Sequence, residues 1–368
     1  MQEPNARRGW SIEDEDEDEE YRVTSVEISA PPIPESAPIT RPTFVSSDAC
    51  LKVLRWDEMV DRLREAYSVP LSDKVSPPRT VARGERTWIR GLASAPPSGR
   101  YMGAKVFGMS RNKRVGYMIA LMDQRSGGFA GLLDAYYVTS FRTGATSAVA
   151  VDALASPGPK TVAVLGSGSE ANSHTLALKE VRTISALRVF SPTAANREAF
   201  AARMQNEHGI PSAAATSPEQ AVAGADIVVA SARSRDESPI LYGEWLKPGT
   251  VVVSIGSTLP EQREIDTSVV DVCDLIVCDM PEEVIDETGD MIAAKKAGVA
   301  FAHKVASLND LMLGKLADRV KSARNPMFKS IGAGIQDIVV AELAFERAVE
   351  QGLATALPVE FQIRQAGK

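Results

Sequence analysis

A short apolar strand that runs directly into a glycine turn constrains the fold of this chain more than any other feature. Residues 162–165 are apolar, and Gly166, Gly168 and Ala171 follow them before a helix-forming stretch. Gly166 permits a tight turn, Gly168 lets the backbone approach a pyrophosphate, and Ala171 lets the helix pack closely on the strand. The helix N-terminus offers N–H groups and its positive dipole end to phosphate. The order strand, turn, helix therefore favours a dinucleotide site over a purely structural turn.

From about residue 160 onward, strand-like and helix-like segments alternate until Leu308. Repeated strand–helix units predict a parallel sheet with right-handed crossovers, which is the Rossmann arrangement. We therefore expect residues 156–324 to form a Rossmann NAD(P)-binding domain. The expected strands are 162–165, 186–190, 227–230, 251–255 and 275–278, and the expected helices include 195–204 and 218–223.

The rest of the chain has a different pattern. Short apolar segments joined by polar turns predict an antiparallel meander, and apolar residues at helical spacing predict helices. We expect an α/β protein in which residues 46–155 and 325–368 form a second, α+β domain that is completed by the C-terminal helix. The expected strands are 101–107, 117–122 and 128–133, and the expected helices are 54–66, 139–155 and 335–351.

The net charge of −7 comes from one end of the chain. Residues 1–20 hold nine acidic residues and two arginines, so the remainder is neutral overall. This acidic run repels itself, and closely spaced prolines follow it, so we expect residues 1–45 to be a disordered acidic, proline-rich tail. The chain has no basic face, and we expect no nucleic-acid partner.

Composition also bears on location and on metal chemistry. The polar, acidic start is unlike a secretory signal, and no apolar run is long enough to span a bilayer. We therefore expect a cytoplasmic protein that makes no membrane contact. The three cysteines and three histidines have no ligand spacing, so we expect no metal site.

The end of the second expected strand indicates which dinucleotide is bound. An acidic residue there accepts a hydrogen bond from the adenosine ribose and selects NAD. This chain has Ser191 and Thr193 there instead, with Arg197 opening the next helix. Hydroxyls and an arginine suit a 2′-phosphate, so NADP is favoured and NAD stays possible. The competing interpretation is that Ser191 or Thr193 caps the helix and that Arg197 is solvated.

Four blocks of sequence together resemble the ornithine cyclodeaminase/mu-crystallin family. They are residues 142–150, the glycine turn at Gly166, residues 256–264 and residues 328–337, and the likeness extends over about residues 50–355. The resemblance implies a homodimer in which the α+β domain binds substrate and forms the dimer contact, while the Rossmann domain holds NAD(P).

Family reactions move a hydride between a nicotinamide and an α-carbon that carries a carboxylate and a nitrogen. The resemblance makes Arg79 the residue that grips the carboxylate and Lys105 the active-site lysine, although strand alternation alone would place Lys105 toward solvent. We expect Arg142 to start a helix, so the dipole predicts an external anionic partner, either substrate carboxylate or cofactor phosphate, with an interface ion pair as the alternative. The expected cofactor contacts are Arg142, Thr143, Gly166, Ser167, Gly168, Ser169, Glu170, Ala171, Ser191, Thr193, Arg197, Ser231, Ala232, Ile255, Gly256 and Ser330.

Thr258 departs from the cyclodeaminase pattern, in which an aspartate acts on the substrate amine. A threonine does not titrate at neutral pH, so the resemblance favours the imine-reductase side of the family, with Ser257 or Thr258 orienting a water or the imine and Lys105 supplying the proton. The function expected is NAD(P)H-dependent reduction of a carboxylate-bearing ketimine or cyclic imine. The alternatives are an ornithine cyclodeaminase with resident NAD, an amino-acid dehydrogenase, and a non-catalytic crystallin-like binding protein.

Overall fold

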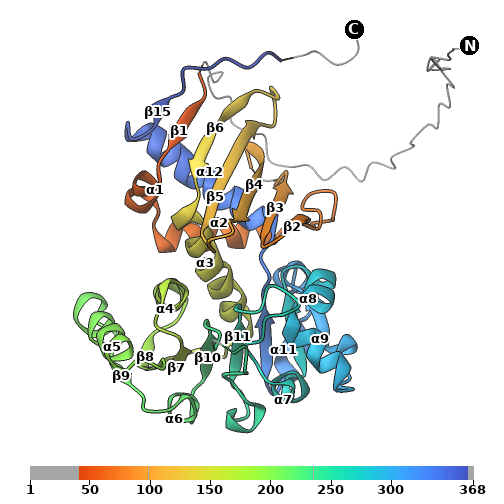
Figure 1. Ribbon diagram of the computed structural model, residues 1–368. Helices are drawn as coiled ribbons and strands as arrows, with labels where there is room; N and C mark the ends of the chain where they lie inside the picture. The colour runs from red at the N-terminus through yellow and green to blue at the C-terminus, as the bar shows by residue number, and fades with distance from the viewer. Residues whose placement is uncertain (1–40, 98, 235, 364–368) are drawn as a thin grey trace, which may run out of the picture. The chain divides into compact units, whose positions relative to one another are not determined.

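The computed structural model describes residues 41–97, 99–234 and 236–363 of the chain (Figure 1). The expected acidic tail therefore lies almost wholly outside the described residues. Its last three positions differ from the expectation, because Thr43–Val45 form strand β1. The described residues belong to one compact unit, which spans residues 33–368.

One sheet has seven strands in the order β15-β1-β6-β5-β4-β3-β2. Strands β2 to β6 pair antiparallel in sequence, which confirms the expected meander, and β1 joins β6 in parallel. The hairpin of β2 and β3 was missed because its strands are interrupted by glycines and charged residues. The bounds are β1 Thr43–Val45, β2 Thr80–Gly84, β3 Thr87–Ser94, β4 Tyr101–Met109, β5 Val115–Asp123, β6 Phe129–Asp134 and β15 Thr355–Ala356.

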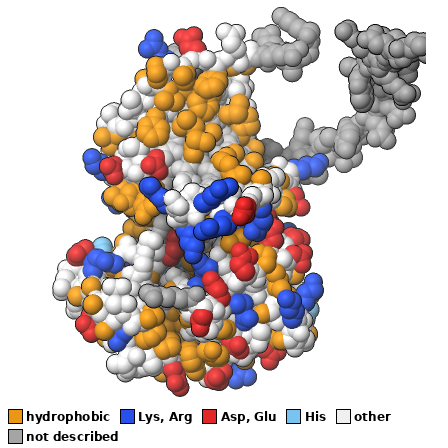
Figure 2. All heavy atoms as spheres, viewed as in Figure 1, with side chains coloured by type: hydrophobic (Ala, Val, Ile, Leu, Met, Phe, Trp, Pro, Cys, Tyr) orange, Lys and Arg blue, Asp and Glu red, His pale blue; other side chains and the backbone are white. Residues whose placement is uncertain are grey.

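Helix α12 packs against this meander sheet and is buried along most of its length (Figure 1). Apolar side chains are exposed elsewhere on the sheet, and Figure 2 shows hydrophobic side chains gathered over this part of the molecule. The exposed apolar residues on β1, β3 and β5 are Phe44, Ile89, Val115, Met118 and Met122.

The other sheet has eight parallel strands in the order β13-β12-β14-β11-β10-β7-β8-β9. This confirms the α/β class and the alternation of strands and helices after residue 160. The bounds are β7 Lys160–Leu165, β8 Ile184–Phe190, β9 Ser212–Ala214, β10 Ile227–Ala230, β11 Val251–Ser254, β12 Leu275–Cys278, β13 Val305–Ser307 and β14 Pro326–Lys329.

Strand β14 changes the picture drawn from sequence. The strand–helix pattern was expected to end at Leu308, and residues 325–368 were expected to belong to the α+β domain. Instead, β14 lies between β11 and β12 inside the parallel sheet. A four-residue strand that begins with proline and ends with a lysine has no recognisable strand pattern. The proposed domain boundary therefore needs to move beyond residue 329.

The helices connect and cover the two sheets. Helix α3 was expected to begin at Thr139 and instead begins at Tyr136, and the single helix expected over 54–66 follows a separate short helix, α1. The bounds are α1 Ser47–Val53, α2 Trp56–Tyr67, α3 Tyr136–Leu154, α4 Ser169–Val181, α5 Ala194–His208, α6 Pro218–Val222, α7 Thr267–Val272, α8 Pro281–Glu287, α9 Gly289–Lys296, α10 Leu308–Met312, α11 Ala317–Ser322 and α12 Gly334–Glu350. Within the described ranges, none of these helices combines the length and apolar character that crossing a bilayer requires.

Candidate active site

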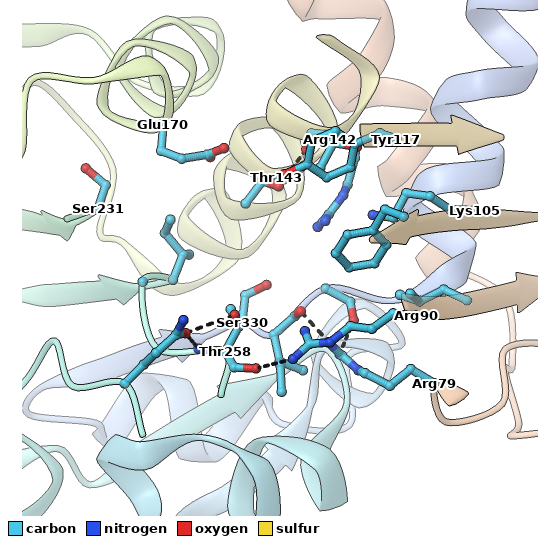
Figure 3. A pocket seen from close by; sticks show the side chains of 18 of the residues that line it. Arg79, Arg90, Lys105, Tyr117, Arg142, Thr143, Glu170, Ser231, Thr258 and Ser330 are labelled. Carbon is cyan, nitrogen blue, oxygen red and sulfur yellow. Dashed lines mark hydrogen bonds between the residues drawn. The ribbon is translucent and has the colours of Figure 1, made fainter. Parts of the chain in front are cut away.

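A cavity of about 380 Å³ opens at the carboxyl ends of the parallel strands, beside strands β3 and β4 of the meander (Figure 3). Its walls come from segments far apart in sequence, and ligands bind at this edge in open α/β sheets. The predicted site residues that line it are Arg79, Lys105, Arg142, Thr143, Glu170, Ser231, Ala232, Ile255, Gly256, Thr258 and Ser330.

The glycine turn at the end of β7 has the geometry that a dinucleotide requires. Gly166 has a φ of +131°, and a Cβ there would come within 3.1 Å of the Ser231 hydroxyl and the Ala232 side chain. Gly168 is the N-cap of α4, and nothing lies within 4 Å of the position of its missing Cβ. A phosphate therefore has an open approach to the N-terminus of a 13-residue helix. Ser167, Gly168 and Ser169 line an adjoining cavity, which shares Glu170 with the first one.

Lys105 and Arg142 both contact one carboxylate, that of Asp337 on α12. Oδ1 of Asp337 accepts from Nζ of Lys105 at 2.8 Å and from Nε of Arg142 at 2.9 Å, while its buried Oδ2 has no hydrogen-bond partner in the described chain. Lys105 is 1% exposed. Burial lowers the pKa of Lys105 to about 8; Asp337 opposes that shift, and Arg142 adds to it. Lys105 therefore titrates near neutral pH inside the cavity.

The expectation that Arg142 opens a helix was wrong, and within the described chain Arg142 has carboxylate and amide partners of its own. Helix α3 begins earlier, at Tyr136, so Arg142 lies in its second turn, where the helix dipole acts weakly. Its partners are Asp337 and Gln336, whose Oε1 accepts from Nη1 at 2.8 Å. Both belong to α12, about 195 residues later in the sequence.

Arg79 is more fully engaged than the sequence suggested. Its Nε and Nη2 donate to Oε2 of Glu283 at 3.0 and 2.8 Å, and Nη2 also donates to the carbonyls of Ile331 and Gly332. Both side chains of this ion pair are almost fully buried. Nη1 is the nitrogen of Arg79 that takes no part in these bonds.

Asp279, which follows β12, organises the turn that carries Ser330. Its carboxylate accepts from the Ser330 hydroxyl at 2.6 Å, from the backbone N–H groups of Ile331 and Gly332, and from Nε2 of Gln336. Sequence reasoning missed Asp279, although an acid directly after a parallel strand is a signal that was available.

Thr258 lines the cavity, whereas Ser257 does not. The Ser257 hydroxyl donates to the carbonyl of Gln262 and accepts from the backbone N–H of Asp290, so it is used in the fold. The Thr258 hydroxyl donates to Oε1 of Gln262 at 3.2 Å. Of the two hydroxyls considered from sequence, Thr258 is the one that reaches the cavity.

Glu170 is the carboxylic acid among the described residues that line the cavity. Its Oε2 is buried and has no hydrogen-bond partner in the described chain. Burial raises the pKa of Glu170 to about 7, while Arg142 acts in the opposite direction. At neutral pH this carboxyl is divided between its charged and neutral forms.

His174 on α4 has a packing role. It is fully buried, and burial lowers the pKa of its imidazole to about 4. Nδ1 donates to the carbonyl of Glu170, and Nε2 accepts from the Ser147 hydroxyl.

The residues expected near the adenosine ribose lie apart from both cavities. Nη1 of Arg197 donates to the carbonyls of Ser191 and Pro192, and its guanidinium lies over the Phe190 ring. The Ser191 hydroxyl accepts from that of Ser167 at 2.9 Å, which ties the strand tip to the glycine turn. The N-cap of α5 is Thr193, and its side chain makes no capping hydrogen bond. The capping role considered for Ser191 or Thr193 is therefore not seen.

A second charged cluster, around Glu264, lies at the carboxyl ends of β10 and β11. It was not expected from the sequence. Glu264 accepts backbone N–H bonds from Ala232, Ile255 and Gly256, so one carboxylate ties together the ends of β10 and β11. Nζ of Lys329 donates to Ser254 and to Asp290, each at 2.8 Å, and all of these side chains are buried. Lys329 is therefore a structural residue beside the cavity.

Arg90 on β3 also lines the cavity and was missed because its strand was missed. Its guanidinium lies over the rings of Trp88 and Phe107, and Nη2 donates to the carbonyl of Thr258 at 3.3 Å.

The fold and the site thus define a dinucleotide-binding α/β protein with a cation-rich cavity at its sheet edge. The model of the ornithine cyclodeaminase/mu-crystallin family matches residues 77–352, and the chain belongs to this family.

Named relatives agree with this assignment. The chain is 32% identical over 253 residues to a Δ1-pyrroline-2-carboxylate reductase of Bacillus cereus. These aligned residues cover 67% of this chain and 77% of that protein. It is 31% identical over 229 residues to the ketimine reductase mu-crystallin of Macropus fuliginosus, covering 62% and 68% of the two chains. The structure of Thermococcus litoralis Δ1-pyrroline-2-carboxylate reductase in complex with NADH and L-proline matches with a TM-score of 0.79 and 27% identity, over 86% of this chain and all of that one.

Proposed function

We propose that this protein is an NAD(P)H-dependent reductase of a ketimine or cyclic imine that bears a carboxylate, and that it forms the corresponding amino or imino acid. The observation that carries this proposal is Lys105, a buried lysine with a pKa of about 8 in a cavity at the dinucleotide edge of the sheet. The reductases among its relatives support the same chemistry.

When bound, NAD(P)H would supply the hydride for the imine carbon. Lys105 donates the proton that the imine nitrogen takes up, because its ammonium makes one bond, to Asp337, and keeps N–H groups for a ligand. Asp337 holds Nζ in place, and positioning of this kind contributes much of the acceleration in such reactions.

The substrate carboxylate is bound by donors that the protein leaves unused. Nη1 of Arg79 and Nη2 of Arg142 take no part in the ion pairs with Glu283 and Asp337. Both side chains line the cavity that contains Lys105. Charge-assisted bonds from these two arginines orient the imine carbon toward the strand ends, where Ile255 and Gly256 form the wall.

Thr258 separates this proposal from a cyclodeaminase. Its hydroxyl lines the cavity but does not titrate near neutral pH, so it orients the imine or a water without exchanging protons. A cyclodeaminase would need an acid at this position, and the chain has Thr258 there instead.

The cofactor is NADP in this proposal, with NAD as the alternative. The tip of β8 has no carboxylate, and Arg197 lies over Phe190 beside that tip with Nη2 unused. Arg197→Ala should weaken NADPH binding about tenfold or more and NADH binding little, as measured by fluorescence titration. Equal effects on the two cofactors would remove the argument for NADP.

We also propose a cytoplasmic homodimer. Phe44, Ile89, Met118 and Met122 alternate onto one face of the meander sheet, and a second copy of the chain would cover this apolar surface. Sedimentation equilibrium tests this, with Met118→Glu expected to produce monomers and a monomeric wild-type protein contradicting it.

The decisive experiment measures two activities of one preparation. Loss of NADPH absorbance with Δ1-pyrroline-2-carboxylate reports imine reduction, and release of ammonia and proline from ornithine reports cyclodeaminase activity. We expect the first and not the second. Robust turnover of ornithine would overturn the proposal, and cofactor binding without reduction of any imine would favour a carrier protein.

A further inference from the structure

Arg90 is a buried cation without a protein carboxylate. It is 4% exposed, and its buried Nε has no hydrogen-bond partner in the described chain. Its one side-chain hydrogen bond runs from Nη2 to the backbone carbonyl of Thr258, at 3.3 Å. An arginine carries five donors, so most of its hydrogen-bonding capacity is unused.

The other cations around the cavity are paired. Arg79 pairs with Glu283, Lys105 and Arg142 share Asp337, and Arg233 pairs with Glu237 at 3.0 Å. Among the described residues that line this cavity, Arg90 is thus the one cation with no carboxylate within ion-pair distance.

The surroundings of Arg90 make an unpaired charge costly. Its guanidinium lies 4.9 Å from the centre of the Trp88 ring and 5.9 Å from that of Phe107. Burial, and then the nearby charge of Arg79, lower the pKa of Arg90 to about 10. Glu287 and Glu261 oppose this lowering, and Arg83 adds to it. A buried charge without a partner is destabilising, and an anionic ligand would relieve that cost.

The sheet register places Arg90 near Lys105, the proposed proton donor, but opposite a different residue of β4. Arg90 is directly opposite Phe107, and Leu92 is opposite Lys105, so all four side chains share one face of the sheet. Nζ of Lys105 lies 5.0 Å from the centre of the same Phe107 ring. An anion bound at Arg90 would therefore lie near Lys105, with the Phe107 ring beside both cations. The α-carboxylate keeps its own donors on Arg79 and Arg142.

The charge balance of the cavity also leaves room for more than one anion. Three carboxylates, those of Glu283, Asp337 and Glu237, pair with four of the five cations among the described lining residues, and Arg90 is the fifth. Glu170 is the further acid at the cavity, and it is partly neutral at pH 7. A substrate with a single carboxylate would leave Arg90 unpaired.

We infer that Arg90 binds a second anionic group of the substrate, so that the preferred imine carries an acidic side chain in addition to its α-carboxylate. This inference rests on the proposed imine reduction and names the substrate class of the same site. Arg90 acts as a specificity residue, and it takes no part in proton transfer.

The test uses two imines of equal carbon number, formed from ammonia with 2-oxoglutarate or with 2-oxovalerate, and follows loss of NADPH. The wild type should prefer the dicarboxylic imine. Arg90→Met should lower kcat/KM for that imine by roughly 10- to 100-fold and for the monocarboxylic imine by less than about threefold, because one charge-assisted interaction is lost. Arg233→Met, which removes a paired cation from the same cavity, is the control and should leave the ratio of the two kcat/KM values unchanged.

Calorimetric titration of the NADPH complex with 2-oxoglutarate and with 2-oxovalerate supplies a readout that does not need turnover. Arg90→Met should weaken binding of the dicarboxylate alone. Equal losses for both ligands would assign Arg90 to the α-carboxylate and overturn the inference. A wild type that prefers 2-oxovalerate, or a monomeric Arg90→Met protein, would overturn it as well.

The two proposals can fail separately. Reduction of Δ1-pyrroline-2-carboxylate with no preference for the dicarboxylic imine would leave the reductase standing and remove the role of Arg90. Selective, Arg90-dependent binding of 2-oxoglutarate without reduction of any imine would support the anion site and contradict the reductase.

Discussion

Two buried charge clusters differ in how completely their hydrogen bonds are filled. In the Glu264 cluster, Glu264 accepts from three backbone N–H groups and from Ser254, and Lys329 is paired with Asp290. In the cavity cluster, Lys105 and Arg142 share a single oxygen of Asp337, and the other oxygen has no partner in the described chain.

The completeness of hydrogen bonding distinguishes a structural cluster from a functional one better than charge or burial does, because both clusters are charged and buried. Buried polar groups are normally satisfied, because an unsatisfied one costs free energy. The Glu264 cluster follows that rule and joins the ends of β10 and β11. The cavity cluster departs from it beside a cavity, and such departures are typical of binding sites.

The largest expected effect is on catalysis by the cavity cluster. Lys105→Met should lower kcat/KM for imine reduction by about 10²- to 10⁴-fold, because the proton donor is lost. The free energy of unfolding should change by no more than about 1 kcal/mol, because burial already disfavours the charge and Arg142 still pairs with Asp337. Steady-state kinetics and thermal unfolding measure the two effects. A strongly destabilised variant would place Lys105 in the same class as Lys329.

Lys329→Met should have the opposite profile. Removing one partner of a buried pair leaves Asp290 uncompensated, so we expect a loss of about 3–5 kcal/mol in the free energy of unfolding. The folded fraction should keep much of its imine reduction, because Lys329 does not line the cavity. The matched control is Lys315→Met, which breaks an exposed pair with Asp310 and should cost less than about 1 kcal/mol.

The two clusters should also respond differently to pH. The pKa of Lys105 is lowered to about 8, and the protonated form is the donor, so kcat/KM should fall as pH rises through about 8. Burial raises the pKa of Glu264 to about 7, and the folded state therefore favours its neutral form. That contribution to stability is present below about pH 4.5 and is lost as pH rises to about 7.

The stability part of this prediction is measured as the difference in Tm between wild type and Glu264→Gln at pH 5 and pH 7.5. The variant lacks the titrating carboxyl, so the wild type should lose more stability than the variant between the two pH values. A difference in Tm that is independent of pH would contradict the role given to Glu264.

The smallest effect should come from the two neighbouring hydroxyls. Thr258→Ala should lower kcat/KM by less than about tenfold and leave stability nearly unchanged, because its hydroxyl makes one neutral bond at the cavity wall. Ser257→Ala should lower the free energy of unfolding and leave kcat/KM nearly unchanged, since the Ser257 hydroxyl is buried and makes two bonds within the fold. A large loss of activity in Thr258→Ala would give that residue a catalytic role.

The sequence by itself determined the features that depend on local chemistry. The glycine turn at Gly166 and the alternation of strands and helices after residue 160 follow from steric freedom and periodicity within short segments. The family resemblance identified Lys105 and Arg79, although strand alternation alone would have turned Lys105 toward solvent.

Only the tertiary structure decided which charges are satisfied. Asp337 lies 232 residues from Lys105 in the chain, and Glu283 lies 204 residues from Arg79. Strand β14 carries Lys329 into the parallel sheet, and the missed strand β3 brings Arg90 to the cavity. A side chain's partners come from whichever distant segments pack against it, and local pattern contains no information about that packing. The unfilled donors of Arg90 therefore became visible only once the chain was folded.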